Sequence, residues 1–139
     1  LAALLSERGE GLTEENVIMG TPDYMAPEQA RDPRTADSRA DVYSLGCTLH
    51  FLLTGRAPYP APSTVSKLLA HREQPIPSIR CDCPQASREL DRVVAKLLAK
   101  KPENRFQTPG EAAAGLGTSI AFFRNRQSVD ADDASLLNN

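Results

Sequence analysis

Cysteine and histidine side chains are the groups in this sequence that could bind a transition metal. Cys81 and Cys83 form a Cys-Asp-Cys pair, Cys47 lies alone in an apolar stretch, and His50 and His71 are the only histidines. A structural zinc site needs four such ligands, usually in two closely spaced pairs, and a second pair is missing. The pattern therefore predicts no metal site, and the odd number of cysteines favours reduced thiols and a cytoplasmic location.

Other binding chemistries are also disfavoured by the residue types. Gly9 and Gly11 do not form a nucleotide-binding loop, because Glu14 stands where a third glycine is needed and no strand precedes the pair. The 16 basic and 18 acidic residues contain no long basic run, which excludes the charge pattern of a nucleic-acid-binding protein or a polybasic membrane patch. No segment reads as a signal peptide or a membrane span.

One charged residue stands at the head of the most apolar element. The stretch from Asp37 to Gly55 predicts a buried helix that Asp37 or Ser38 caps and Gly55 ends. It has Val42, Leu45, Leu49 and Leu52 on one face, and Gly46, Cys47, Phe51 and Leu53 leave little face for water. Asp41 lies in its first turn, where an enclosed carboxylate would need hydrogen-bond donors. The alternative is that Asp41 only favours the helix dipole.

Four further helices are expected around this central one. Pro27 starts a short helix through Ala30, and Ser63 or Thr64 caps a second that runs to about Glu73. This second helix is predicted to carry Val65, Leu68 and Leu69 inward and to offer an exposed face to partners. Ser87 opens a third, stopped by Pro102, whose apolar face consists of Leu90, Val93, Val94, Leu97 and Leu98. The fourth starts with a capping box over Thr108 to Glu111 and continues to Leu116 or beyond.

The two ends of the 139-residue chain have no helix or strand period. Residues 1–20 form an almost unbroken polar run and predict a mobile loop, and the polar, acidic stretch from Arg124 predicts a frayed tail. Because the chain begins at Leu1 rather than Met, we interpret it as a fragment; the alternative is a chain that was only processed or trimmed at its start.

Four motifs in order resemble the C-terminal half of a eukaryotic-like (Hanks-type) serine/threonine protein kinase. They are Gly20-Thr21, Ala26-Pro27-Glu28, the run from Asp41 to Gly46, and the run from Pro102 to Phe106. The phrases from Tyr24 to Ala30 and from Leu52 to Tyr59 look most like the bacterial branch. The resemblance implies a mainly α fold, the helical part of the large C-terminal lobe, with the small lobe and the catalytic loop missing. It covers residues 1–120 as a partial kinase domain, with the activation segment over 1–30 and a helical subdomain over 31–120, and leaves 121–139 as a disordered tail.

The same resemblance implies a role for several residues. Glu28 and Arg105 match a buried ion pair, for which the alternative is two separate surface charges. Asp41 matches the aspartate that accepts hydrogen bonds from the backbone of the catalytic loop. The substrate-binding loop is matched by Gly20, Thr21 and Pro22. Thr21 would link that loop to the catalytic aspartate, and the alternative is that it is only a turn residue. Thr13 and, less directly, Ser6 lie where kinases of this family carry activating phosphates, and the alternative is that both are unmodified polar loop residues.

The family's catalytic motifs do not occur in this chain. Phosphoryl transfer needs a glycine-rich loop, a lysine on the phosphates, a catalytic aspartate, and an asparagine and an aspartate that hold magnesium. The sequence contains neither His-Arg-Asp nor Asp-Phe-Gly. We therefore expect no catalytic residue, metal ligand or cofactor here, whereas the full-length parent would use ATP and Mg²⁺ on protein substrates.

Three interpretations of the chain remain open. The first is an inactive fragment of a serine/threonine kinase, whose partners are the parent's protein substrates and the missing N-terminal half. The second is a non-catalytic, kinase-derived module that binds proteins through the helix from Thr64 to Glu73. The third is a half that completes an enzyme in trans. The sequence encoded before Leu1 discriminates among the three.

Overall fold

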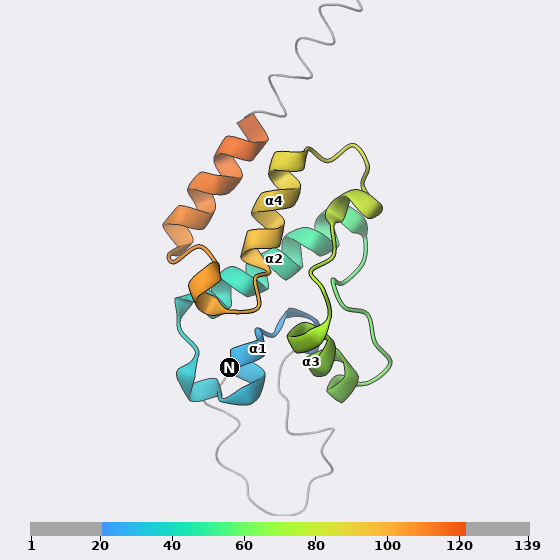
Figure 1. Ribbon diagram of the computed structural model, residues 1–139, viewed down its shortest axis with the longest axis vertical. Helices are drawn as coiled ribbons and strands as arrows, with labels where there is room; N and C mark the ends of the chain where they lie inside the picture. Colours follow the sequence, from blue (N-terminus) through green and yellow to red (C-terminus); the bar gives the residue numbers. More distant parts are fainter. Residues whose placement is uncertain (1–20, 122–139) are drawn as a thin grey trace, which may run out of the picture.

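The helix α2 (Ser38–Thr54) is the longest described helix, and α4, η3 and η5 pack on it (Figure 1). The computed structural model describes residues 21–121. The Asp37 carboxylate caps α2 by accepting a hydrogen bond from the backbone N–H of Arg39 at 2.9 Å. Gly55 ends the helix with a φ of 76°, a left-handed conformation that favours glycine. Both predicted bounds of the central helix are confirmed.

The remaining regular structure is also helical. The other helices are α1 (Pro27–Arg31), α3 (Thr64–Glu73), α4 (Arg88–Leu97) and a last helix over 109–121. Four 3-10 turns separate them: η3 (Pro22–Tyr24), η4 (Pro33–Thr35), η5 (Ile79–Cys81) and η6 (Pro102–Asn104). Residues 21–121 contain no strand, which confirms the mainly α fold class.

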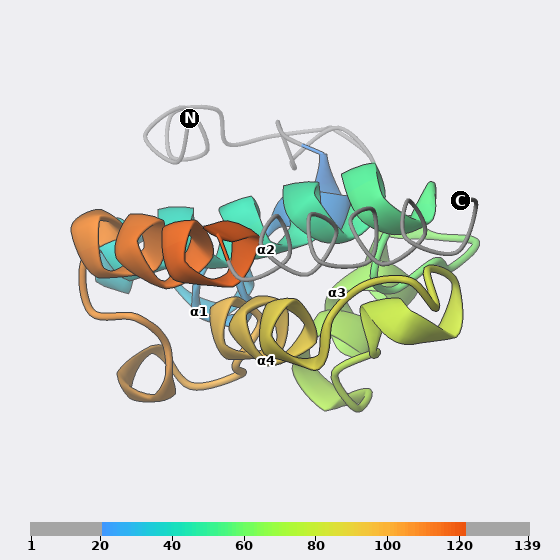
Figure 2. The same cartoon turned by 90° about the horizontal axis from the view of Figure 1, so that it is seen from above.

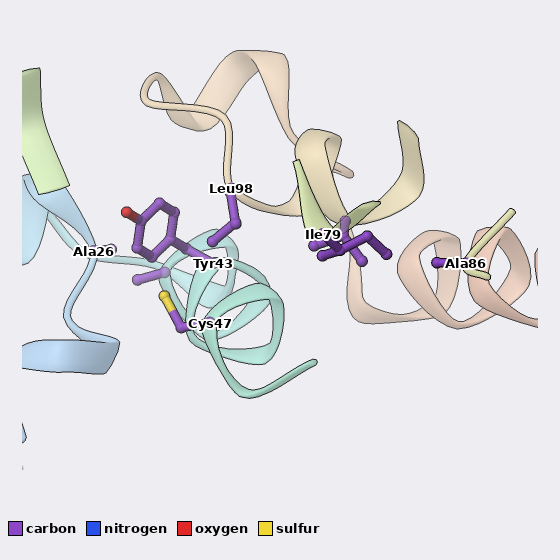
Figure 3. Packing of buried hydrophobic residues seen from close by; sticks show 8 residues of the cluster. Ala26, Tyr43, Cys47, Ile79, Ala86 and Leu98 are labelled. Atoms are coloured by element: carbon purple, nitrogen blue, oxygen red, sulfur yellow. The ribbon is translucent and has the colours of Figure 1, made fainter. Parts of the chain in front are cut away.

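The helices α3 and α4 lie on the same side of α2 when the molecule is seen from above (Figure 2). Where α4 crosses α2, a side chain at Gly46 would place its Cβ 2.8 Å from the Leu97 Cβ. The missing Cβ therefore allows the two backbones to approach closely. A cluster around this crossing joins α2 and α4 to the segments before α1 and after α3 (Figure 3).

The central helix is not enclosed on all sides, and this part of the prediction was wrong. Its core face carries Val42, Tyr43, Gly46, Cys47 and His50, whereas Leu45, Phe51 and Leu52 are 38%, 44% and 70% exposed. Among residues 21–121, α4, η3 and η5 pack on it most extensively, Tyr43 reaches His71 of α3, and Val42 packs near Ala112 of the last helix. The apolar period identified a face that could be buried, but it did not show whether a neighbour covers that face.

The orientation of α3 also differs from the prediction. Ser63 caps the helix by accepting a hydrogen bond from the Ser66 N–H at 3.1 Å, as expected. However, Val65 and Leu69 are 60% and 43% exposed, Leu68 is only half-buried, and the buried residues of the helix are Ala70 and His71.

The helix α4 begins at the expected Ser87 cap but ends at Leu97, five positions before Pro102. Its end is set by a tertiary contact, because the carbonyls of Ala99 and Lys100 accept hydrogen bonds from the Arg105 guanidinium. The capping box of the last helix forms in part. Thr108 accepts from the Glu111 N–H, but the Glu111 carboxylate accepts from Gln107.

None of the described helices is long and apolar enough to cross a membrane. The predicted mobile loop over 1–20 and the predicted tail from 121 onward lie outside the described residues, apart from residue 121 itself.

Candidate functional site

The structure brings Glu28 and Arg105 together, although they are 77 positions apart in the sequence. Nη1 of Arg105 donates to Oε1 of Glu28 at 2.6 Å, and Nη2 donates to Oε2 at 2.8 Å. The Arg105 side chain is fully buried and that of Glu28 is 11% exposed. This is the two-bond geometry in which a planar guanidinium meets a carboxylate.

All five N–H donors of Arg105 have acceptors. Besides the two bonds to Glu28, Nε donates to the Ala99 carbonyl at 2.8 Å, Nη1 to the Arg39 carbonyl at 2.9 Å and Nη2 to the Lys100 carbonyl at 3.1 Å. The guanidinium carbon also lies 4.8 Å from the centre of the Tyr43 ring. The charge is therefore compensated within the core, and one side chain connects α1, the first turn of α2 and the segment after α4.

The short helix α1 depends on these contacts. Five residues are far too few for a helix that is stable alone. Its first turn is supported by Pro27 and by the Gln29 side chain, which accepts a hydrogen bond from the Ala26 N–H at 3.0 Å. Glu28 then anchors the helix to Arg105 in the core. The motif Ala26-Pro27-Glu28 thus combines a helix start with a tertiary anchor.

A second buried polar cluster lies between α2 and α3. The Tyr43 hydroxyl and Nδ1 of His71 are 2.7 Å apart, and the edge of the Tyr59 ring packs on His71 with the ring centres 4.9 Å apart. Burial, followed by the positive charge of Lys100, lowers the pKa of His71 to about 4. His71 is therefore neutral at neutral pH and completes the packing beneath the segment before α1.

Lys100 links this cluster to the Arg105 region. Its ammonium group donates to the Tyr59 hydroxyl at 2.8 Å and to the His71 carbonyl at 2.6 Å, and it lies 4.1 Å from the centre of the Tyr59 ring. Burial lowers the pKa of Lys100 to about 8. Sequence reasoning missed this cluster, because His71, Tyr59 and Lys100 belong to separate segments with no shared spacing. The one available signal was a histidine inside an apolar helical stretch.

The predicted substrate-loop residues fall at the edge of the described structure. Thr21 is exposed and precedes η3, and Pro22 is the first residue of that turn. The turn is held on α2 by a hydrogen bond from the Ser44 hydroxyl to the Tyr24 carbonyl at 2.7 Å. Asp23 pairs with Lys67 of α3 at 3.0 Å. Gly20 lies outside the described residues, as do Thr13 and Ser6.

Asp41 lies on the exposed side of α2, in its first turn. With Leu45, Thr48, Phe51 and Leu52 it forms a continuous exposed row along the helix, which we call the α2 stripe. The hydrogen bonds of residues 21–121 include none to the Asp41 side chain. The structure thus separates Asp41 from Glu28 and Arg105, which are anchored in the core.

Residues 21–121 contain no metal-binding cluster, and their buried thiol is not activated. Within residues 21–121, no group of three or more His, Cys, Asp or Glu side chains could hold a metal ion. Burial raises the pKa of the Cys47 thiol to about 12, so this cysteine is not a nucleophile at neutral pH. The arrangement can position a loop and present surfaces.

Comparison with known proteins agrees with the motifs placed above. The sequence model of the protein kinase domain matches residues 1–114. The chain is 44% identical over 117 residues to the serine/threonine-protein kinase PknB of Mycolicibacterium smegmatis and 46% identical over 118 residues to PknB of Mycobacterium tuberculosis. It is 41% identical over 117 residues to the serine/threonine-protein kinase Pkn1 of Myxococcus xanthus.

These matches cover most of this chain but only a small part of each relative. Each covers 84% of this chain, but only 18% of the two PknB proteins and 15% of Pkn1. The chain therefore spans less than a fifth of the length of these curated relatives. The matched residues include the Glu28–Arg105 pair and the α2 helix. This chain belongs to the protein kinase domain family.

Proposed function

We propose that this chain is the substrate-facing helical part of a bacterial serine/threonine protein kinase, inactive by itself and dependent on the N-terminal half of the domain. The observation that carries the proposal is the anchored segment from Thr21 to Arg31. The Glu28–Arg105 pair fixes its end in the core, and Ser44 and Lys67 fix its middle. A loop held at several points on a rigid helical base is suited to present a substrate.

The α2 stripe supports the dependence on another part of the domain. It places three large apolar side chains, Leu45, Phe51 and Leu52, in solvent along one side of the central helix. A contiguous exposed apolar row commonly marks a surface that another element covers. Asp41 lies at one end of this row, where its carboxylate would accept hydrogen bonds from the backbone of the catalytic loop.

The residues present do not fit ATP or Mg²⁺. Residues 21–121 offer no cluster of three acidic or other metal-binding side chains. The full sequence lacks the glycine-rich loop and the Asp-Phe-Gly and His-Arg-Asp motifs. Positioning of the phosphates and of magnesium supplies nearly all of this catalysis, so the chain alone is proposed to transfer no phosphate. Nucleotide and metal would be bound by the parent's other half.

A segment exchange tests the proposal. Residues 1–121 replace the matching segment of M. smegmatis PknB, and magnesium-dependent phosphorylation of a model protein is measured for the exchange protein and for the isolated chain. We expect phosphorylated serine or threonine from the exchange protein and none from the chain. Transfer by the pure chain would contradict the proposal, as would an exchange protein that folds and binds ATP but remains inactive.

A variant of the exchange protein tests the substrate loop. Thr21 is exposed and makes no side-chain cap, so Thr21→Ala should leave folding unchanged. If Thr21 links the loop to the catalytic aspartate, its loss should lower transfer by on the order of 100-fold through mispositioning. The exposed Thr35→Ala, outside the loop, is the matched control. Equal rates for both variants would remove Thr21 from the proposal.

We further propose that Thr13, and after it Ser6, are phosphorylated in the active parent. Both lie in the polar run before Thr21, where a phosphate could pair with arginines and order the loop. Mass spectrometry of the active full-length protein tests this, and two unmodified sites would contradict it.

A further inference from the structure

Two adjoining hollows lie where α1, α3 and the segment after α4 meet. One has a volume of about 380 Å³ and the other about 200 Å³. Both are lined by Pro27, Arg31 and Arg72, so they form one continuous depression, which we call the α1–α3 groove. Figure 1 shows α1 and α3 side by side at this place.

One half of the α1–α3 groove is apolar. It is lined by Ala30 from α1 and by Val65, Leu68 and Leu69 from α3. Val65 and Leu69 are two of the three α3 side chains that were predicted to point inward, yet they are 60% and 43% exposed. Two large apolar side chains one helical turn apart thus face solvent at the edge of a depression, which is a preferred place for a partner's apolar side chain.

The other half is basic. Lys100 and Lys101 line it together with the shared Arg31 and Arg72. Among the described residues, neither Arg31 nor Lys101 has a carboxylate within salt-bridge distance, whereas Arg72 pairs with its neighbour Glu73. Of the two acidic lining residues, Glu28 is already neutralised by Arg105, whereas Glu103 is exposed and pairs with none of the described basic residues. The four basic lining side chains still outnumber the acidic ones, so the groove keeps a surplus of positive charge.

We propose that the α1–α3 groove is a docking site for an extended acidic segment of a partner protein that carries apolar side chains a few residues from its carboxylates. The apolar side chains would occupy the half lined by Val65 and Leu69, and the carboxylates would pair with Arg31 and Lys101. Charge complementarity identifies the acidic partner, and the apolar half distinguishes a peptide from a free anion.

The groove is separate from the surface assigned to the missing half of the kinase domain. None of its lining residues belongs to the α2 stripe, and α3 lies below α2 in Figure 2, packed through η3 and α1. Covering the stripe therefore leaves the groove open. Docking requires no phosphoryl transfer, so the inference stands or falls independently of the proposed function.

Fluorescence anisotropy with the complete 139-residue chain tests the inference. The probe is a labelled synthetic peptide with paired leucines and clustered aspartates, and its control forms have serine for leucine or asparagine for aspartate. We expect saturable binding of the probe that weakens as salt is raised, because the ion pairs are exposed. Each control peptide should bind roughly tenfold more weakly or worse.

Variants of the chain assign the binding to the groove. Arg31→Glu combined with Lys101→Glu should weaken binding by about tenfold or more, since attraction becomes repulsion at two positions. A peptide with lysine in place of aspartate should bind the same double variant more tightly than it binds the unsubstituted chain. Leu69→Ser tests the apolar half. These residues are exposed, so the variants should keep the far-UV circular dichroism spectrum of the parent.

Two exposed residues outside the groove serve as matched controls. Arg88→Glu and Ile120→Ser change exposed residues outside the groove and should leave affinity unchanged. The inference is overturned if the Arg31 and Lys101 double variant binds the probe as the parent does. It is also overturned if the serine-for-leucine peptide binds as tightly as the probe. A third contrary outcome is that anionic lipid vesicles bind the chain and lose binding in the double variant, while the peptide does not bind.

Discussion

Removing either partner of the Glu28–Arg105 ion pair should cause the largest loss of stability available from one substitution in this chain. Arg105→Ala takes away a fully buried guanidinium that makes five hydrogen bonds. It leaves the Glu28 carboxylate, 11% exposed, without its partner. Breaking a buried pair in this way typically costs about 3–5 kcal/mol, because the remaining charge is uncompensated.

The structure places the expected cost at the upper end of that range or above it. Three backbone carbonyls, those of Arg39, Ala99 and Lys100, also lose a donor. A buried acceptor left unpaired costs roughly 1–3 kcal/mol unless water reaches it. Whole domains are stable by only about 5–15 kcal/mol, and this chain exposes an apolar stripe that would lower its margin. Arg105→Ala should therefore abolish cooperative unfolding, and Glu28→Gln should lower stability by about 3 kcal/mol or more.

Urea unfolding followed by far-UV circular dichroism measures these effects. The matched control is Arg34→Ala, since Arg34 pairs with Asp32 at 3.1 Å but its side chain is 89% exposed. An exposed pair contributes only about 0–1 kcal/mol, so the control should unfold near the parent's midpoint. Arg105→Lys adds a second comparison. A lysine keeps the charge but offers three donors instead of a planar set of five, and it should recover only part of the loss.

Equal losses of stability at the buried and the exposed ion pair would contradict this prediction. Should Glu28→Gln and Arg105→Ala each stay within about 1 kcal/mol of the parent, the ion pair would not stabilise the chain. A double variant that loses no less than the sum of the two single losses would show that the two side chains do not interact. Either result would remove the anchor of α1 on which the candidate site depends.

Two further predictions follow from packing and from burial. Gly46→Ala should destabilise the chain by about 1–3 kcal/mol, because its Cβ would lie 2.8 Å from the Leu97 Cβ and would push α2 and α4 apart. Urea unfolding measures this loss, and the control is Gly117→Ala, whose Cβ would meet no neighbouring atom. The pKa of His71 is lowered from 6.5 to about 4, so the unfolded chain takes up this proton first. Stability should be complete above pH 6.5 and fall between pH 6.5 and 4, and His71→Gln should reduce that slope in urea titrations at several pH values.

Local signals in the sequence were sufficient for the bounds of α2 and α3. Asp37, Gly55 and Ser63 act through hydrogen bonds or dihedral angles of their immediate neighbours, so their effect can be read without knowing the rest of the fold. The end of α4 could not be read in this way. It is set by Arg105, whose side chain takes the carbonyls of Ala99 and Lys100.

Burial was the least predictable property, and the reason is geometric. A helical period groups Leu45 with Leu49 and Leu52, or Val65 with Leu69, but the core forms only where another element is present. The cluster of Tyr43, His71 and Lys100 was missed for the same reason, since its members meet only after α3 has packed beneath α2. The family motifs indicated the Glu28–Arg105 pair through resemblance, and no spacing rule would have paired residues so far apart.

The ion pair and the α1–α3 groove are connected through α1. A helix of five residues cannot hold its own conformation in water, and Glu28 anchors it in the core. The neighbouring side chains Pro27, Ala30 and Arg31 line the groove. On the other side, Lys100 lines the groove while its backbone carbonyl accepts from Arg105. The buried Arg105 guanidinium thus holds both walls of the basic half of the groove. The geometry of the groove therefore depends on Arg105, although Arg105 does not line it.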